Sequence, residues 1–147
     1  MRIVFVEIQN FRGIKKLDWA PATAVNCLIG PGDSTKTTIL DAIELALNPR
    51  SYMFADDSDF FDLDVDRPIK VTVTLAGLPS EFRSDDRYGM HLRGWNAQET
   101  KVEDEPDERL EDALSVRVTI DKSLEARWSI FNNLIDEKES DPPTVRY

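Results

Sequence analysis

Residues 30–38 carry the residue types and spacing that bind phosphate groups. They read GPGDSTKTT, which nearly matches the phosphate-loop pattern G-x-x-x-x-G-K-[ST]. In such loops, backbone N–H groups and the positive end of the following helix bind phosphate oxygens. The pattern therefore predicts a nucleotide site with ATP as the ligand. The candidate nucleotide-binding residues are Gly30, Pro31, Gly32, Asp33, Ser34, Thr35, Lys36, Thr37 and Thr38.

Individual positions in this loop predict distinct roles. Lys36 would reach the β- and γ-phosphates, the Thr37 hydroxyl would bind Mg²⁺ with the nucleotide, and Thr38 could touch the α-phosphate. Thr35 stands where the pattern has glycine, so a stiff, β-branched side chain adds bulk there unless it points away. Asp33 must point outward, because acid beside phosphate is unfavourable. The alternative is an ordinary strand–turn–helix with a lysine near the turn.

The segments on either side of the loop fit this prediction. Residues 24–30 (AVNCLIG) form a continuous apolar run, which predicts a strand buried on both faces with Cys27 as a small buried hydrophobe. Residues 35–50 predict a helix that ends at Asn48-Pro49. Its apolar residues at helical spacing are Ile39, Leu40, Ile43, Ala46 and Leu47.

Strands dominate the rest of the chain. Residues 2–11 and 14–19 predict two strands, and residues 68–79 alternate apolar and polar side chains as a third strand does. Residues 113–133 predict a hairpin broken near Lys122-Ser123. We expect one domain over 1–147: strands, loop and first helix in 1–50, an acidic loop in 51–66, antiparallel strands in 67–132 and a loose tail in 133–147.

Composition limits the classes of function. The chain has 147 residues, with 18 Lys and Arg against 28 Asp and Glu, a net charge of −10. Such a surface repels phosphate backbones, so we expect little direct DNA binding, although a local basic strip could exist. One cysteine excludes an internal disulfide, and no apolar stretch approaches ~20 residues, so we expect no membrane contact and a cytoplasmic protein. The aspartates of residues 56–66 lack the calcium-loop pattern and predict a solvated loop.

The motifs, taken in order, resemble a known family. EIQNFRGI (7–14) followed by residues 26–50 resembles the start of the ABC-type ATPase heads of chromosome-maintenance (SMC) and DNA-repair proteins, including RecF. The later motifs DSDFF, PIKVTVTLAGLP, LRGWN, EDEP and ALSVRVTIDKSLEARW are similar to the OLD family (overcoming lysogenization defect) of ATP-dependent nucleases. The resemblance runs from Arg2 to about Trp128. The chain departs from the usual loop G-x-N-x-x-G-K-[ST] at Gly32 and Thr35.

The resemblance implies a function for the parent protein. OLD-type proteins join an N-terminal ABC-type ATPase to a C-terminal Toprim endonuclease domain, and they act in DNA processing, DNA repair or phage defence. In related heads, ATP is held between two head domains, which implies DNA and a second head, in a homodimer, as partners. The arginine of the NFR motif, here Arg12, would lie near the nucleotide. Its alternative is a turn arginine in solvent.

Other family motifs are not found in this sequence. It contains no SGG-type signature, no apolar strand ending in DE (Walker B) and no Toprim acidic constellation. We therefore expect a fragment that binds ATP and Mg²⁺ through its Walker A loop but does not hydrolyse ATP well alone, and we name no catalytic residue. The expected fold is an α/β P-loop NTPase half-head, with a mixed sheet around the loop-bearing helix plus antiparallel strands.

Two other functions stay open. A non-hydrolysing interaction module would explain Thr35 as the mark of a degenerate loop. A small P-loop kinase or GTPase is more remote, because the guanine-reading pattern N-K-x-D is not present.

Overall fold

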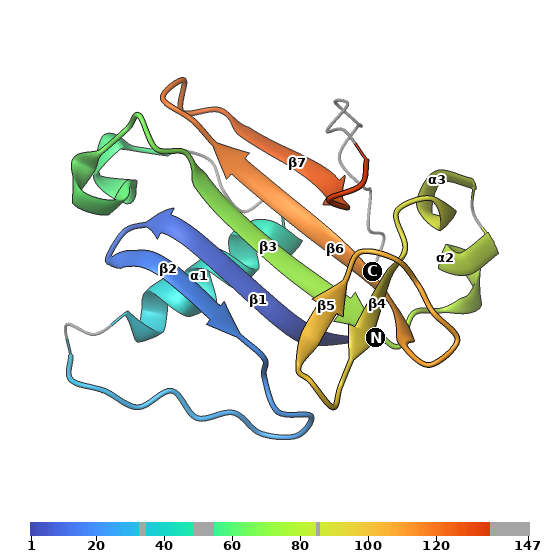
Figure 1. Cartoon of the computed structure of the whole chain (residues 1–147). Coiled ribbons are helices and arrows are strands. Elements are labelled where there is room, and N and C mark those ends of the chain that lie inside the picture. Colours follow the sequence, from blue (N-terminus) through green and yellow to red (C-terminus); the bar gives the residue numbers. More distant parts are fainter. Residues whose placement is uncertain (33–34, 49–54, 85, 136–147) are drawn as a thin grey trace.

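The computed structural model describes residues 1–32, 35–48, 55–84 and 86–135. It shows a curled sheet with one long helix, α1 (Lys36–Leu47), across one face and short helices at its margins (Figure 1). The strands are β1 (Arg2–Phe11), β2 (Ile14–Trp19), β3 (Ile69–Ala76), β4 (Arg93–Asn96), β5 (Lys101–Glu103), β6 (Glu111–Ile120) and β7 (Ala126–Phe131). The short helices are η1 (Asp57–Asp59), η2 (Phe61–Leu63), α2 (Ser80–Ser84) and α3 (Asp86–Gly89).

The sheet is antiparallel throughout the described residues. Its strands lie in the order β2-β1-β3-β6-β4-β5, and β7 pairs with β6 as well. β6 has room for both neighbours because β4 pairs with its first residues (Glu111–Ala113) and β7 with the rest (Ser115–Ile120). The predicted antiparallel strands are therefore confirmed. The predicted mixed sheet around the loop-bearing helix is wrong for the described part of the chain.

The core lies between α1 and the sheet. Side chains alternate along each strand, so every second residue of the central strands points toward the helix. Val6 and Ile8 of β1 and Val71 and Val73 of β3 are fully buried. From α1, three residues at helical spacing complete this layer: Ala42, Leu45 and Ala46. Burial of this stripe, rather than helix propensity, fixes α1 in place on the sheet.

The prediction of a buried strand at residues 24–30 is wrong. This segment has no regular secondary structure, and Val25 and Ile29 are 82% and 93% exposed. Cys27 is also exposed, so it is not a buried hydrophobe. A strand needs a neighbour to bond its backbone N–H and C=O groups, and residues 24–30 pair with no strand of the described sheet. The backbone instead turns locally, where Asn26 exchanges two side-chain hydrogen bonds with the backbone of Ala22.

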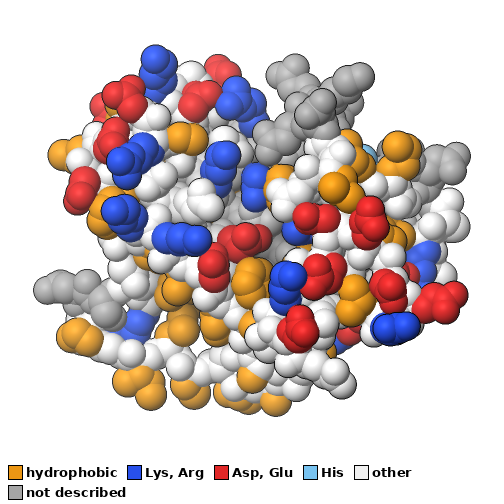
Figure 2. Space-filling model, in the orientation of Figure 1, with side chains coloured by type: hydrophobic (Ala, Val, Ile, Leu, Met, Phe, Trp, Pro, Cys, Tyr) orange, Lys and Arg blue, Asp and Glu red, His pale blue; other side chains and the backbone are white. Residues whose placement is uncertain are grey.

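The face of the sheet opposite α1 is polar (Figure 2). Lys and Arg side chains gather on one part of it, with Asp and Glu among them and beside them. Lys16 and Lys70 pair with Gln9 from its two sides in the strand register. These two lysines form a small basic strip. The positive charge of the strip is partly neutralised, because Lys16 Nζ lies 3.8 Å from Asp18 Oδ2. Among the described helices, none is long and apolar enough to cross a membrane.

Candidate functional site

The helix α1 begins within the phosphate-binding pattern, as the sequence predicts. Thr35 is its N-cap residue, and Lys36, Thr37 and Thr38 form its first turn. That turn contains no acidic residue, and the Thr35 side chain makes no capping hydrogen bond within it. The first N–H groups of a helix have no partner inside the helix and carry the positive end of its dipole. The start of α1 therefore favours an anion.

Lys36 folds back over the residues that precede it. Its Nζ donates hydrogen bonds to the carbonyl oxygens of Gly30 and Pro31, the latter at 2.8 Å. Gly30, Pro31 and Gly32 are exposed, and a β-carbon at Gly32 would meet no atom of the described residues within 4 Å. The predicted residues Asp33 and Ser34 lie outside the described residues. Thr37 is exposed and Thr38 is half-buried.

Thr35 points its methyl group toward the turn between β1 and β2. A β-carbon added to Gly13 of that turn would lie 3.0 Å from Thr35 Cγ2, so the methyl group occupies the space that a side chain at position 13 would need. The residue that replaces the usual loop glycine thus directs its extra bulk toward the sheet. Whether Thr35 leaves the phosphates room at this position stays a prediction.

Arg12, in the same turn, is bonded rather than free in solvent. Its Nη1 donates a 2.5 Å hydrogen bond to Asp41 of α1, and its Nε donates one of 3.1 Å to Asp59 of η1. Burial lowers the pKa of the Arg12 guanidinium, but the bonds to Asp41 and Asp59 outweigh this and hold the pKa above its ordinary value. Arg12 is thus a turn arginine whose side chain is 36% exposed and bonded to two carboxylates. Its predicted place beside a nucleotide stays a prediction.

The acidic loop is held by its own backbone contacts. Asp56 accepts a hydrogen bond from the N–H of Ser58, and Asp59 accepts one from the N–H of Asp56. Phe60, 1% exposed, anchors the loop to the core and forms an isolated bridge with Phe11. No group of three or more His, Cys, Asp or Glu among the described residues could hold a metal ion. Asp59 also accepts a hydrogen bond from Arg12, which links this loop to the turn between β1 and β2.

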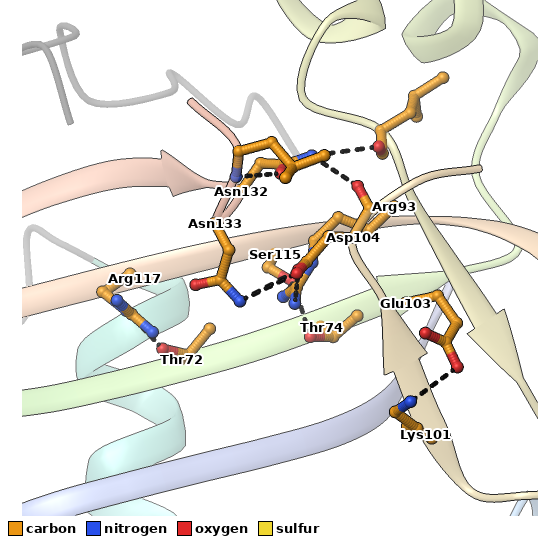
Figure 3. Close-up of polar contacts among 12 residues, drawn as sticks. Thr72, Thr74, Arg93, Lys101, Glu103, Asp104, Ser115, Arg117, Asn132 and Asn133 are labelled. Carbon is orange, nitrogen blue, oxygen red and sulfur yellow. Dashed lines mark hydrogen bonds and ion pairs between the residues drawn. The ribbon is translucent and has the colours of Figure 1, made fainter. Parts of the chain in front are cut away.

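A second polar cluster lies around Arg93, on the face of the sheet opposite α1 (Figure 3). Arg93 is 4% exposed and donates to Ser115 at 2.9 Å and to Asp104 at 2.7 Å. Asn133 also donates to Asp104, and Asn132 donates to the Asp104 carbonyl oxygen at 3.0 Å. These bonds tie β4, β6 and the residues after β7 together. We interpret the cluster as structural, because each of these contacts joins two elements of the fold.

Comparison with known proteins shows the family of this chain. Residues 1–142 match the family described as "AAA ATPase domain". The chain belongs to this AAA ATPase domain family. Because the match covers nearly the whole chain, the phosphate-binding pattern lies inside a domain of matching type.

Two known proteins are similar to parts of this chain. The chain is 35% identical over 71 residues to the OLD nuclease of Thermus scotoductus, covering 46% of this chain and 13% of that protein. It is 34% identical over 59 residues to the DNA replication and repair protein RecF of Chlorobium limicola, covering 40% of this chain and 16% of that protein. The matched segments thus span less than a fifth of the length of these relatives.

A solved structure shares the fold. The chain is similar, at a TM-score of 0.57 and 13% identity, to a structure from work on ATP-driven dimerization and DNA-stimulated activation of SMC ATPases. The similarity covers 88% of this chain and 69% of that one. It supports the predicted P-loop NTPase-like fold, although the described sheet is antiparallel.

Sequence reasoning located the loop but missed the residues that position it. Gly13, Asp41 and Asp59 come from three separate parts of the chain and meet only in the folded protein. Asp41 is the first acidic residue of α1, five positions beyond Lys36, and this was a usable signal. Nothing in the sequence pattern indicated that the missing side chain of Gly13 makes room for Thr35.

Proposed function

We propose that this chain is the ATP-binding N-terminal part of an OLD-like, ATP-dependent endonuclease. Residues 30–38 would hold the nucleotide phosphates, and ATP would gate a dimer of two heads in the parent protein, in DNA processing or phage defence. The proposal rests on one observation. The helix α1 begins at Lys36, directly after the glycine-bearing loop, in a chain of the AAA ATPase domain family.

The residues present fit a bound nucleotide. Lys36 already places its Nζ against two loop carbonyl oxygens, and phosphate oxygens would be stronger, charged partners for the same donor. Open space at Gly32 allows close approach to the backbone. Thr37 is exposed in the first turn of α1, where its hydroxyl could bind Mg²⁺ together with the phosphates. Bound Mg²⁺ would neutralise charge on the nucleotide.

The role of Thr37 provides the test. Mg²⁺ should strengthen ATP binding in the wild-type chain and in the control Thr119→Ala, which removes a hydroxyl from the sheet. In Thr37→Ala, ATP should bind with little dependence on Mg²⁺. Fluorescence titration of a labelled ATP analogue, with and without Mg²⁺, measures this. Equal Mg²⁺ dependence in Thr37→Ala and Thr119→Ala would contradict the proposed role.

One observation favours the second candidate, an interaction module that binds no nucleotide. Val25 and Ile29 are strongly exposed apolar side chains in one segment, and such patches often mark protein contacts. The two candidates predict different results for the variant Lys36→Ala. Only the nucleotide-binding function requires Lys36.

A further inference from the structure

We propose that Gly13 is a positioning residue for the phosphate loop. Its missing side chain receives the methyl group of Thr35, which allows a threonine to occupy the loop's glycine position without covering the phosphates. The contact itself is independent of the proposed function, whereas its effect on nucleotide affinity rests on that function. Gly13 and Thr35 would then act as a coupled pair, twenty-two positions apart in the sequence.

The space between the two residues is tight. A β-carbon at position 13 would lie 3.0 Å from Thr35 Cγ2, well inside the ~3.5–4.0 Å at which two carbon atoms pack best. Because Gly13 does not have a positive φ, conformational freedom does not explain the glycine. Among the described residues, the neighbouring methyl group is the contact that requires glycine at position 13.

Thr35 has a side-chain direction that agrees with this role. It is half-buried, and its hydroxyl does not cap α1, which is the usual task of a threonine at this position. A β-branched side chain is stiff about its first torsion angle, so the position of the methyl group also sets the direction of the hydroxyl. Displacing the methyl group would therefore turn the whole side chain at the loop's end.

The turn that carries Gly13 cannot easily move away. The backbone N–H of Arg12 donates to the Asp59 carbonyl oxygen at 2.7 Å, and the Arg12 side chain bonds to Asp41 of α1. On either side, Phe11 and Ile14 pair with each other across β1 and β2 and are 1% and 6% exposed. Since the turn is fixed to α1 and to the core, an alanine at position 13 should push the Thr35 side chain away and shift the start of α1 with it.

A set of substitutions tests the coupling. Gly13→Ala should weaken Mg²⁺-ATP binding at least tenfold in the wild-type chain and lower Tm. In a Thr35→Gly background, which has no methyl group beside position 13, adding Gly13→Ala should change neither the affinity for Mg²⁺-ATP nor Tm. Gly13→Ala with Thr35→Ser should also be rescued, because serine keeps the hydroxyl and lacks the methyl group. An alanine at position 13 also stabilises the protein by restricting the unfolded chain. This effect is the same with Thr35 and with Gly at position 35, so it cancels when the two Tm changes are compared.

The matched control is Gly89→Ala. A β-carbon there would meet its nearest neighbour, the Arg83 carbonyl oxygen, at an ordinary 3.9 Å, so its effect should be the same with Thr35 and with Gly at position 35. An equal effect of Gly13→Ala in both backgrounds, or no effect in either, would overturn the proposal. If Tm shows the coupling while wild type binds no ATP, the Gly13–Thr35 contact is supported and the proposed function is contradicted.

Discussion

Arg12 illustrates how one side chain joins the parts of the candidate site. It reaches α1 through Asp41 and η1 through Asp59, and its guanidinium carbon lies 4.7 Å from the centre of the Phe11 ring. The turn between β1 and β2 is thereby held against the helix that starts at the phosphate loop. The arginine that the family resemblance places at the nucleotide therefore has a structural role in this fold.

Asp41→Asn should lower the free energy of unfolding by about 1 kcal/mol. The substitution keeps the shape of the side chain and removes the charge that strengthens its hydrogen bond with Arg12, and the partial exposure of both groups limits the loss. Urea unfolding measures the difference. Glu44→Gln, an exposed change on the same helix, is the control and should stay within about 0.5 kcal/mol of wild type. An equal effect of the two changes would show that the Arg12 contact contributes nothing.

Glu7 should make stability depend on pH. Burial raises the pKa of Glu7 above its ordinary value, while Arg117 and Arg93 act in the opposite direction. The charged form therefore disfavours folding at neutral pH, and this penalty is absent below the pKa of an unfolded glutamate, about 4.3. Glu7→Gln should raise Tm at pH 7, and the gain should shrink as the pH falls toward 4. The exposed Glu125→Gln should show no such trend, and a constant gain for Glu7→Gln would contradict the assignment.

At the scale of elements, the cluster around Arg93 fixes β4 to the rest of the sheet. Asp104→Ala should cost about 2–3 kcal/mol, because it leaves the guanidinium of Arg93 buried without its carboxylate partner. Chemical denaturation measures the loss. Asp112→Ala removes a carboxylate from the more exposed pair with Arg83 and should cost less than about 1 kcal/mol. Similar losses for the two variants would contradict a special role for the Arg93 cluster.

Local patterns predicted most elements but failed at the segment before the loop. The alternation in residues 68–79 and the apolar stripe of α1 gave correct elements, because each pattern reports directly which face is buried. Residues 24–30 have the composition of a buried strand, yet a strand also requires neighbouring strands, which composition does not report. The same limit applies to the partners of Arg12, which depend on long-range contacts.

The exposure of this segment can be tested through Cys27. Its thiol should react with a disulfide reagent in the folded protein at a rate within about threefold of that in denaturant, because no opening of the structure is required. Absorbance of the released chromophore measures the rate. A Cys27 reaction about 100-fold or more slower in the folded protein would show that the segment is buried, as the strand predicted from the sequence requires.

At the scale of the whole molecule, the phosphate loop lies at one end of a sheet-and-helix layer. The loop, the turn at Gly13 and the start of α1 converge there, although the chain carries a net charge of −10. Local donors, rather than the overall field, must therefore attract a nucleotide. The motif predicted these donors from the sequence, whereas the antiparallel arrangement of the sheet depends on strand pairing across the chain.

Calorimetric titration of Mg²⁺-ATP into the wild-type chain and Lys36→Ala is the most direct test of the central claim. Lys70→Ala, which removes a lysine from the opposite face of the sheet, controls for the change in net charge. Wild type and Lys70→Ala should bind ATP, and Lys36→Ala should show no binding. Equal binding by all three proteins, or no binding by wild type at ATP well above ~1 mM, where an affinity of about 4 kcal/mol would be detected, would contradict a nucleotide site at residues 30–38.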